Sequence, residues 1–210
     1  MLAYYKHLSN LLAAQVCPVG KPVTWISMDP GLRERKKSAT RQALHEAAVR
    51  LALEHGPDRV TVESIADAAD VSRRTFSNYF AGKEEAIFHG DLLRLRRLLA
   101  LVRDRPADEP PRAALTEAAR LLLAGSDRPD PLWVAQRRLL RGHPSLVAHQ
   151  VAAYAVVERE LAAEVGARGL DDLRARVLAA TFLAALRAAT QHWLEHPDRS
   201  LAEWVSEALA

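Results

Sequence analysis

The chain has 210 residues, of which 49% are hydrophobic and 26% are charged. This composition is typical of a soluble globular protein with one large or two small domains. The net charge of only +3 excludes a protein that binds nucleic acid through bulk charge, so any such affinity requires a local basic patch. A single cysteine, Cys17, excludes an internal disulfide framework and fits a cytoplasmic protein, and no apolar run reaches the ~18 residues that span a bilayer.

Residues 1–27 differ in character from the rest of the chain. A short amphipathic piece is followed by Pro18, Gly20 and Pro22, which interrupt regular structure. We expect this segment to be a flexible arm, or an over-long start that precedes the biological start at Met28.

The first firm helix is predicted over residues 32–55, where apolar side chains recur at helical spacing and Gly56-Pro57 then ends the helix. Its start is crowded with cations, namely Arg33, Arg35, Lys36, Lys37 and Arg41. Cations oppose the positive end of a helix dipole, so local stability does not explain them. A phosphate backbone nearby would explain them, and a solvated charged face is the alternative.

Two short helices joined by a tight turn are predicted over residues 61–80. Thr61 and Ser72 can cap the two helices, because their hydroxyl groups can accept hydrogen bonds from first-turn amides. Asp70, between them, tolerates the left-handed backbone of a turn better than most residues. Apolar contacts from Val71 and Phe76, and from Tyr79 or Phe80, would lock the second helix against the first.

The second of these helices leaves several polar side chains free of any role in the core. They are Arg73, Arg74, Thr75, Ser77 and Asn78. A helix with arginines in its first turn fits the recognition helix of a helix-turn-helix, since arginine can hold guanine O6 and N7 with two hydrogen bonds. An ordinary helix pair in an all-α core is the alternative interpretation.

These motifs resemble the DNA-binding domain of TetR-type transcriptional regulators. The resemblance covers Ile65 to Ser72, Thr75 to Phe80, and Lys83 to Ile87, with Asp70 where many relatives carry glycine. It implies base contacts from Arg73, Arg74 and Ser77. It also implies phosphate contacts from Thr61, Tyr79 and Lys83, joined by Lys36 and Lys37 at the basic start of the first helix. Ser72, Thr75 and Asn78 complete the expected DNA-binding set.

Beyond the helix that begins at Lys83, the chain reads as helical throughout. A break at Arg105 to Pro111 is followed by helices predicted at about 112–125, 130–142, 145–166, 171–195 and 200–209. Their breakers are residues 125–129, Gly142-His143-Pro144, residues 166–169, and His196-Pro197-Asp198. The expected fold is therefore all-α. The resemblance implies a three-helix DNA-binding domain over 28–90 and a ligand-binding and dimerisation domain over 91–210.

The C-terminal half resembles one subgroup of TetR-type regulators, some of which sense fatty acyl-CoA thioesters. The resemblance implies that the last two long helices pair with their copies in a homodimer, as a palindromic operator requires. It also implies that the other helices enclose a cavity for a small-molecule effector, for which an acyl-CoA-like compound is our first candidate. The expected lining residues are Trp133, Arg137, Leu140, Val147, Val151 and Tyr154. Arg137, Arg138 and Arg141 could meet an anionic ligand or face solvent.

Two alternative functions remain open at this point. His192, Glu195 and His196 match the H-x-x-E-H pattern of zinc peptidases, although histidine near a helix end also complements the negative end of the helix. A ligand carrier that has lost DNA binding is the second alternative. The preferred interpretation is a ligand-responsive repressor of TetR type, with double-stranded DNA as its partner and with no enzymatic activity, cofactor or metal.

Overall fold

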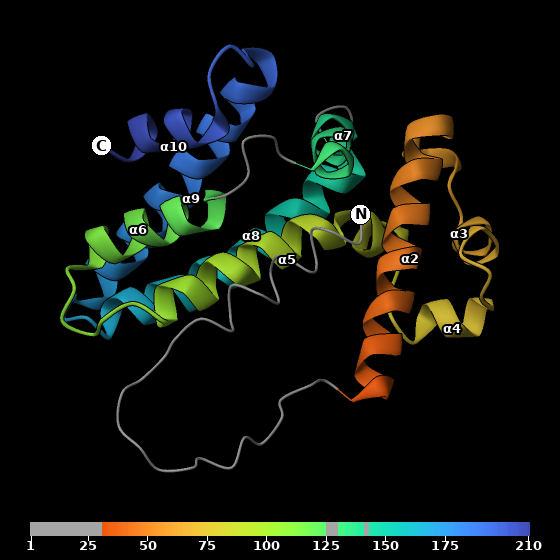
Figure 1. Ribbon diagram of the computed structural model, residues 1–210, viewed down its shortest axis with the longest axis horizontal. Helices are drawn as coiled ribbons and strands as arrows, with labels where there is room; N and C mark the ends of the chain where they lie inside the picture. Colours follow the sequence, from red (N-terminus) through yellow and green to blue (C-terminus); the bar gives the residue numbers. More distant parts are fainter. Residues whose placement is uncertain (1–30, 125–129, 141–142) are drawn as a thin grey trace, which may run out of the picture. The chain divides into compact units, whose positions relative to one another are not determined.

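The computed structural model describes residues 31–124, 130–140 and 143–210. The chain divides into two compact units, Met1–Arg35 and Lys36–Ala210, and the second contains nearly all of the described residues. The expectations for residues 1–27, for Cys17 and Arg141, and for the breaks at 125–129 and Gly142 lie outside the described residues. Every regular element of the described chain is helical (Figure 1), which confirms the predicted fold class.

The helix boundaries agree with the sequence-based predictions to within two residues. In chain order, the elements are α2 (Leu32–His55), the short 3-10 turn η1 (Pro57–Arg59), α3 (Val62–Ala68), α4 (Arg73–Ser77), α5 (Lys83–Arg103), α6 (Pro111–Leu123), α7 (Pro131–Leu140), α8 (Pro144–Gly166), α9 (Asp172–Glu195) and α10 (Leu201–Leu209). Among the described residues, none of these helices combines the length and apolar character needed to cross a membrane.

The α3–α4 pair is built by local hydrogen bonds. The hydroxyl group of Thr61 accepts from the Ser64 amide at 3.1 Å, and the Ser64 hydroxyl group accepts from the Thr61 amide at the same distance. Ser72 caps α4 by accepting from the amide of Thr75 at 3.0 Å. Asp70 has φ 54°, which confirms that an aspartate here adopts the left-handed backbone that the turn requires.

The first hydrophobic cluster surrounds the helix-turn-helix. Its buried side chains come from α2, α3, α4 and the first half of α5, and include Leu44, Ile65 and Phe76. Leu140 of α7 and Leu146 of α8 also belong to this cluster. The helices that follow the DNA-binding motif in the sequence therefore complete its core.

The second hydrophobic cluster joins the distal half of α5 to α6, α8, α9 and α10. Leu98, Leu115 and Leu161 are among its most deeply buried members. Helix α5 thus serves both clusters, and Leu92 and Tyr154 pack against both of them. In Figure 1, α5 runs from the helices of the DNA-binding motif to α6 and lies along α8.

Lys83, the first residue of α5, holds the end of η1. Its ammonium group donates to the carbonyl oxygens of Pro57 at 2.9 Å, Val60 at 3.0 Å and Asp58 at 3.4 Å. An ammonium group has three donors, so these carbonyls account for its hydrogen-bonding capacity. Lys83 therefore connects the start of α5 to the segment between α2 and α3.

Two buried histidines lie where α2 meets α5. The Nδ1 atom of His45 lies 2.8 Å from the carbonyl oxygen of Ala86. Since a carbonyl oxygen only accepts, Nδ1 of His45 carries the proton. The His89 ring packs edge-on against the rings of Phe80 and His45, at centroid distances of 5.2 and 5.7 Å. Burial, followed by the charge on His45, lowers the pKa of His89 to about 4, and burial also lowers the pKa of His45.

The depressed pKa of His89 makes the protein sensitive to acid. The unfolded chain takes up a proton below pH ~6.5 whereas the folded protein does so only near pH 4, so the free energy of unfolding falls as the pH drops through this window. We expect wild type to lose about 2 kcal/mol more than His89→Phe between pH 7.5 and pH 5, measured by urea denaturation. Between pH 7.5 and 8.5 the two proteins should change equally. Parallel losses on acidification would contradict the assignment.

The contacts of Lys83 predict a role in stability. Lys83→Met keeps the length of the side chain but removes three hydrogen bonds to carbonyl oxygens, so the free energy of unfolding should fall by about 1–3 kcal/mol. Lys37→Met is the matched control, because the Lys37 side chain is exposed on α2, and it should leave stability unchanged. Chemical denaturation measures both. A Lys83→Met protein as stable as wild type would show that the ammonium group does not stabilise the fold.

Candidate DNA-binding surface and effector cavity

Helix α4 presents its polar side chains to solvent. The side chain of Arg73 is 73% exposed and forms an ion pair with Glu63 at 3.1 Å. Arg74, Ser77 and Asn78 are also exposed, whereas Phe76 anchors the helix in the core. An exposed ion pair contributes about 0–1 kcal/mol, so the Arg73 guanidinium is accessible to a stronger partner.

The remaining residues predicted to contact DNA lie around α4. They differ in how far their side chains are already engaged by other groups of the protein. Thr61 is exposed, and its hydroxyl group caps α3. Tyr79 is half-buried beneath the guanidinium of Arg41, which lies 5.6 Å from its ring centroid. The phosphate contact predicted for Lys83 remains a prediction, because the ammonium group is bound to carbonyl oxygens in this structure.

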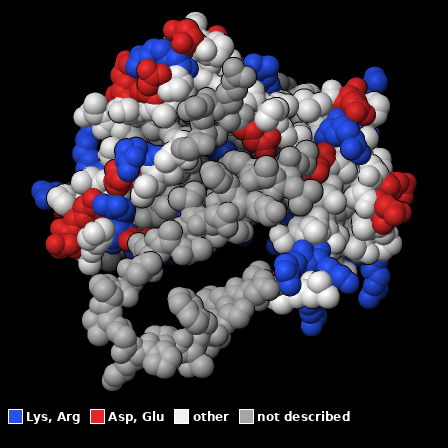
Figure 2. Space-filling model, in the orientation of Figure 1, with Lys and Arg blue, Asp and Glu red and all other residues white. Residues whose placement is uncertain are grey.

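The hydroxyl groups of α4 are partly engaged within the motif. The hydroxyl group of Ser77 donates to the carbonyl oxygen of Arg73 at 3.2 Å, and those of Ser72 and Thr75 lie 2.9 Å apart. Lys36 and Lys37 are exposed on the N-terminal half of α2. In Figure 2, basic side chains gather at the lower right, where α4 and this half of α2 lie in Figure 1.

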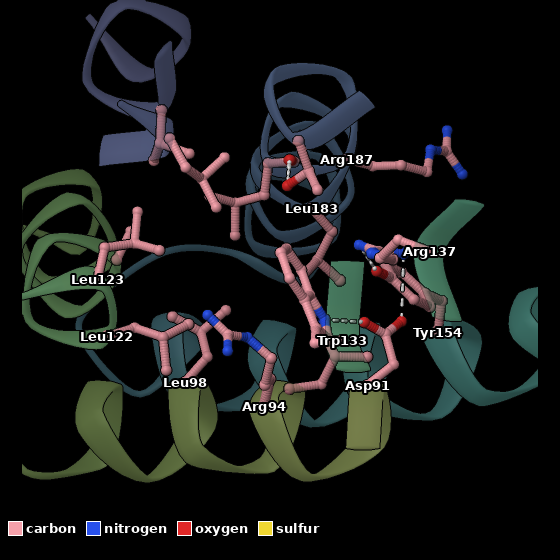
Figure 3. A pocket seen from close by; sticks show the side chains of 16 residues that line it. Asp91, Arg94, Leu98, Leu122, Leu123, Trp133, Arg137, Tyr154, Leu183 and Arg187 are labelled. Atoms are coloured by element: carbon pink, nitrogen blue, oxygen red, sulfur yellow. Dashed lines mark hydrogen bonds and ion pairs between the residues drawn. The ribbon is translucent and has the colours of Figure 1, made fainter. Parts of the chain in front are cut away.

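A cavity of about 60 Å³ lies among α5, α6, α7, α8, α9 and α10. Its walls are mostly apolar, and they include Leu98 of α5, Leu122 of α6 and Leu183 of α9 (Figure 3). Pockets for drug-sized ligands usually hold about 300–1,000 Å³. A ligand of that size therefore requires the walls of this cavity to move apart.

One corner of the cavity is polar, as Figure 3 shows. Oδ1 of Asp91 accepts a hydrogen bond from Nε1 of Trp133 at 3.2 Å, and Oδ2 lies 3.2 Å from Nη1 of Arg137. Nη2 of Arg137 donates to the hydroxyl group of Tyr154 at 3.2 Å. The side chains of Asp91 and Arg137 are only 3% and 10% exposed, so this is a buried ion pair.

Burial and neighbouring charges determine the protonation states of the side chains in this corner. Burial raises the pKa of Tyr154, which keeps its hydroxyl group protonated. Burial lowers the pKa of the Arg137 guanidinium, but the Asp91 carboxylate and the Tyr154 hydroxyl group together more than offset this effect, so the net pKa is raised. The corner therefore holds a permanent cation, its carboxylate partner and a neutral phenol.

The six residues predicted to line one pocket fall into three places. Trp133, Arg137 and Tyr154 line the cavity. Leu140 and Val147 line a second hollow of about 430 Å³, which Arg137 also borders, and Val151 lines a third of about 190 Å³, together with Tyr154. The side chains of Val147 and Val151 are 40% and 58% exposed. The structure therefore brings together only half of the predicted set in the 60 Å³ cavity.

The sequence did not indicate several polar residues of the cavity. Asp91 and Arg94 lie on α5, and Arg187 lies on α9. Both helices show strong apolar patterns that predict packing rather than ligand contact. The pairing of Asp91 with Arg137 spans the fold, so no local spacing could have revealed it. Arg138, which sequence analysis grouped with Arg137, is exposed and does not line the cavity.

The helices α2, α5 and α7 approach one another closely at Gly90. A Cβ atom at Gly90 would lie 2.8 Å from Nε2 of His45 and 3.2 Å from Oε1 of Gln136, so only glycine fits here without a shift. Gln136 is completely buried, and neither polar atom of its amide has a hydrogen-bond partner among the described residues. On α5 Gly90 precedes Asp91, and on α7 Gln136 precedes Arg137, so each side of the crossing is adjacent to the buried ion pair.

The H-x-x-E-H pattern does not form a metal site in the described part of the chain. The rings of His192 and His196 lie 4.6 Å apart at their centroids, and His192 also packs edge-on against Trp204. No group of three or more potential ligands occurs among the described residues. The exposed ring of His192 therefore contacts the neighbouring ring of His196 and an aromatic side chain of α10.

The sequence matches two described families. Residues 44–88 match the bacterial regulatory proteins of the tetR family, and residues 109–210 match the MftR C-terminal domain. The HTH-type transcriptional regulator TcmR of Streptomyces glaucescens is 35% identical over 184 residues, covering 82% of this chain and 80% of TcmR. The putative mycofactocin biosynthesis transcriptional regulator MftR of Mycobacterium tuberculosis is 31% identical over 180 residues, covering 83% of this chain and 89% of MftR.

Solved structures show the same fold. SmeT in complex with triclosan has a TM-score of 0.59 at 18% identity, and the match covers 81% of this chain and 88% of SmeT. NalD of Pseudomonas aeruginosa has a TM-score of 0.54 at 21% identity, with coverages of 83% and 95%. These likenesses concern the fold alone, whereas the similarity to TcmR and MftR extends over most of the sequence. The chain therefore belongs to the TetR family of transcriptional regulators, which are not enzymes, and it carries an MftR-type C-terminal domain.

Proposed function

We propose that the protein is a homodimeric repressor that binds a palindromic operator and is released from it by a small lipophilic effector. The observation that carries the proposal is the exposure of an arginine-led helix, α4, on a firmly capped helix-turn-helix. Arg73 and Arg74 are free to meet base edges in the major groove. Residues 28–90 would bind DNA, and residues 91–210 would dimerise and bind the effector.

Exposed apolar side chains on α8 and α9 support dimerisation through these helices. Val156 of α8 is 46% exposed, and Leu173 and Val177 of α9 are 70% and 53% exposed. Thr181, Ala184 and Ala188 continue the exposed face of α9 at helical spacing. A stripe of small and apolar side chains lets a second helix approach closely, and burial against a twin subunit would remove this surface from water.

The cavity supports the choice of effector. Its walls are mostly apolar, with a few polar side chains, as expected for a site that takes a lipophilic molecule and orients it with a few polar groups. An acyl-CoA-like compound has both an apolar chain and negative charge, and it remains our first candidate. The small volume of the cavity means that such an effector would push its walls apart.

The helix crossing at Gly90 supports a mechanical coupling between the cavity and the DNA-binding domain. Asp91 and Arg137 line the cavity, and their neighbours Gly90 and Gln136 meet His45 of α2. A ligand that displaces α7 relative to α5 would therefore move side chains in the core beneath the recognition helix. Such a ligand would favour a different placement of the DNA-binding domains and lower the affinity for the operator, and the coupling would be reciprocal.

The operator role of Arg73 is tested with purified protein and the DNA that flanks its own gene. Arg73→Ala should weaken operator binding by about 1–3 kcal/mol and relax specificity at one base pair, as measured by fluorescence anisotropy on a set of operator variants. Arg120→Ala on α6 is the control, because it removes an exposed arginine outside the DNA-binding motif. Unchanged binding by Arg73→Ala across all variants would refute the role, and absence of DNA binding by wild type would favour a ligand carrier.

The proposed dimer is tested by measuring the mass of the native protein. Native mass spectrometry of protein from its own host should show twice the chain mass, and it would also reveal any retained effector. Ala184→Glu places a charge in the middle of the exposed face of α9 and should shift the protein towards monomer. Leu93→Glu changes a similarly exposed apolar residue of α5, which is 42% exposed, and should leave the dimer intact. A monomeric wild type would contradict the proposal.

A further inference from the structure

The polar corner of the cavity has hydrogen-bond donors that are not in use. Nε of Arg137 is buried and has no hydrogen-bond partner among the described residues. The hydroxyl group of Tyr154 accepts from Nη2 of Arg137, and its own proton has no acceptor in the described part of the chain. Both groups lie on the cavity wall, where an unpaired buried donor is costly and therefore calls for a partner.

The carboxylate of Asp91 on the same wall faces donors of the protein, although its Oδ2 makes an ion pair without a hydrogen bond. Oδ1 of Asp91 accepts from Trp133, and Oδ2 faces Nη1 of Arg137 at ion-pair distance. The hydroxyl group of Thr190 on α9 uses its proton to donate to the carbonyl oxygen of Leu186 at 2.8 Å. A ligand group that offers acceptors would satisfy the unpaired donors of Arg137 and Tyr154 in this corner.

The charge of the lining favours the same class of ligand. Three cationic side chains, Arg94, Arg137 and Arg187, border the cavity with a single carboxylate, that of Asp91. The guanidinium of Arg94 lies 4.4 Å from the ring centroid of Trp133. It therefore packs against the side chain that donates to Asp91 in the polar corner. An excess of positive charge around an apolar cavity raises the local concentration and affinity of anions.

We propose that this corner binds an acidic group of the effector, which accepts hydrogen bonds from Nε of Arg137 and from the hydroxyl group of Tyr154 while the apolar body of the effector extends among the leucines. The inference rests on the proposed function in taking the cavity as the effector site, but the binding it describes does not depend on DNA. Asp91 keeps its place opposite Nη1 and holds the guanidinium in position. Selectivity for acidic over neutral or cationic lipophiles then resides in Arg137 and Tyr154.

The proposal is tested with a matched pair of fluorescent probes that share one aromatic skeleton. The first, 8-anilinonaphthalene-1-sulfonate, carries a sulfonate group, and the second, N-phenyl-1-naphthylamine, is neutral. The full-length protein should bind one sulfonate probe per chain at least about tenfold more tightly than the neutral probe, because charge-assisted hydrogen bonds are the strongest available here. Fluorescence titration measures both affinities.

Two variants locate the selectivity. Tyr154→Phe removes only the hydroxyl group, and Arg137→Lys keeps the charge opposite Asp91 but removes the Nε donor. Each should weaken binding of the sulfonate probe about tenfold and leave the neutral probe unaffected. Arg138→Met, which removes an exposed arginine one position further along α7, is the control and should change neither affinity. Circular dichroism melting shows that each variant is folded.

Several outcomes would overturn the proposal. Equal affinity of wild type for the two probes, failure to bind the sulfonate probe, or sulfonate binding that survives both Tyr154→Phe and Arg137→Lys would each do so. These results are independent of operator binding. A protein that binds the sulfonate probe selectively but never binds DNA would support the acidic-ligand site while refuting the repressor, and the reverse pattern would refute only the site.

Discussion

The ion pair between Asp91 and Arg137 is the contact on which the arrangement of the C-terminal helices depends. Both side chains are almost completely buried, and a buried charge without its partner typically costs several kcal/mol. Helix α7 must therefore dock on α5 with Arg137 opposite Asp91, or the protein loses much of its stability. The same pair positions Trp133 and Tyr154, so the requirement that docks the helix also builds the polar corner of the cavity.

Helix α5 links the two halves of the protein because its two ends belong to different hydrophobic clusters. The change from one cluster to the other occurs around His89, Gly90 and Asp91, where the absence of a side chain at Gly90 lets three helices meet. The buried amide of Gln136 has no partner there among the described residues. An unsatisfied polar group at a helix crossing is a reason to expect a second arrangement of the crossing in which the amide is satisfied.

The helix-turn-helix could be predicted in detail because its determinants are local. The caps at Thr61 and Ser72, and the left-handed residue Asp70, act over only a few residues of chain. A reader of the sequence therefore has all the interacting groups in view. The exposure of Arg73 follows in the same way, since Phe76 must face the core and a short helix then turns the arginine outwards. The prediction of the cavity residues was less successful, because only Trp133, Arg137 and Tyr154 of the predicted set line the 60 Å³ cavity.

The sequence by itself determined the helical class, the helix boundaries and the recognition helix, because capping and periodicity are read within a few turns of chain. Only the tertiary structure decided how Asp91, Lys83 and Gln136 are used. Asp91 meets Trp133 across 42 residues of chain, and Lys83 reaches Pro57 across 26. Such contacts depend on how whole helices pack, and a buried charge looks the same in the sequence as an exposed one. The cavity arises from these long-range contacts, so its chemistry became visible only when the helices were in place.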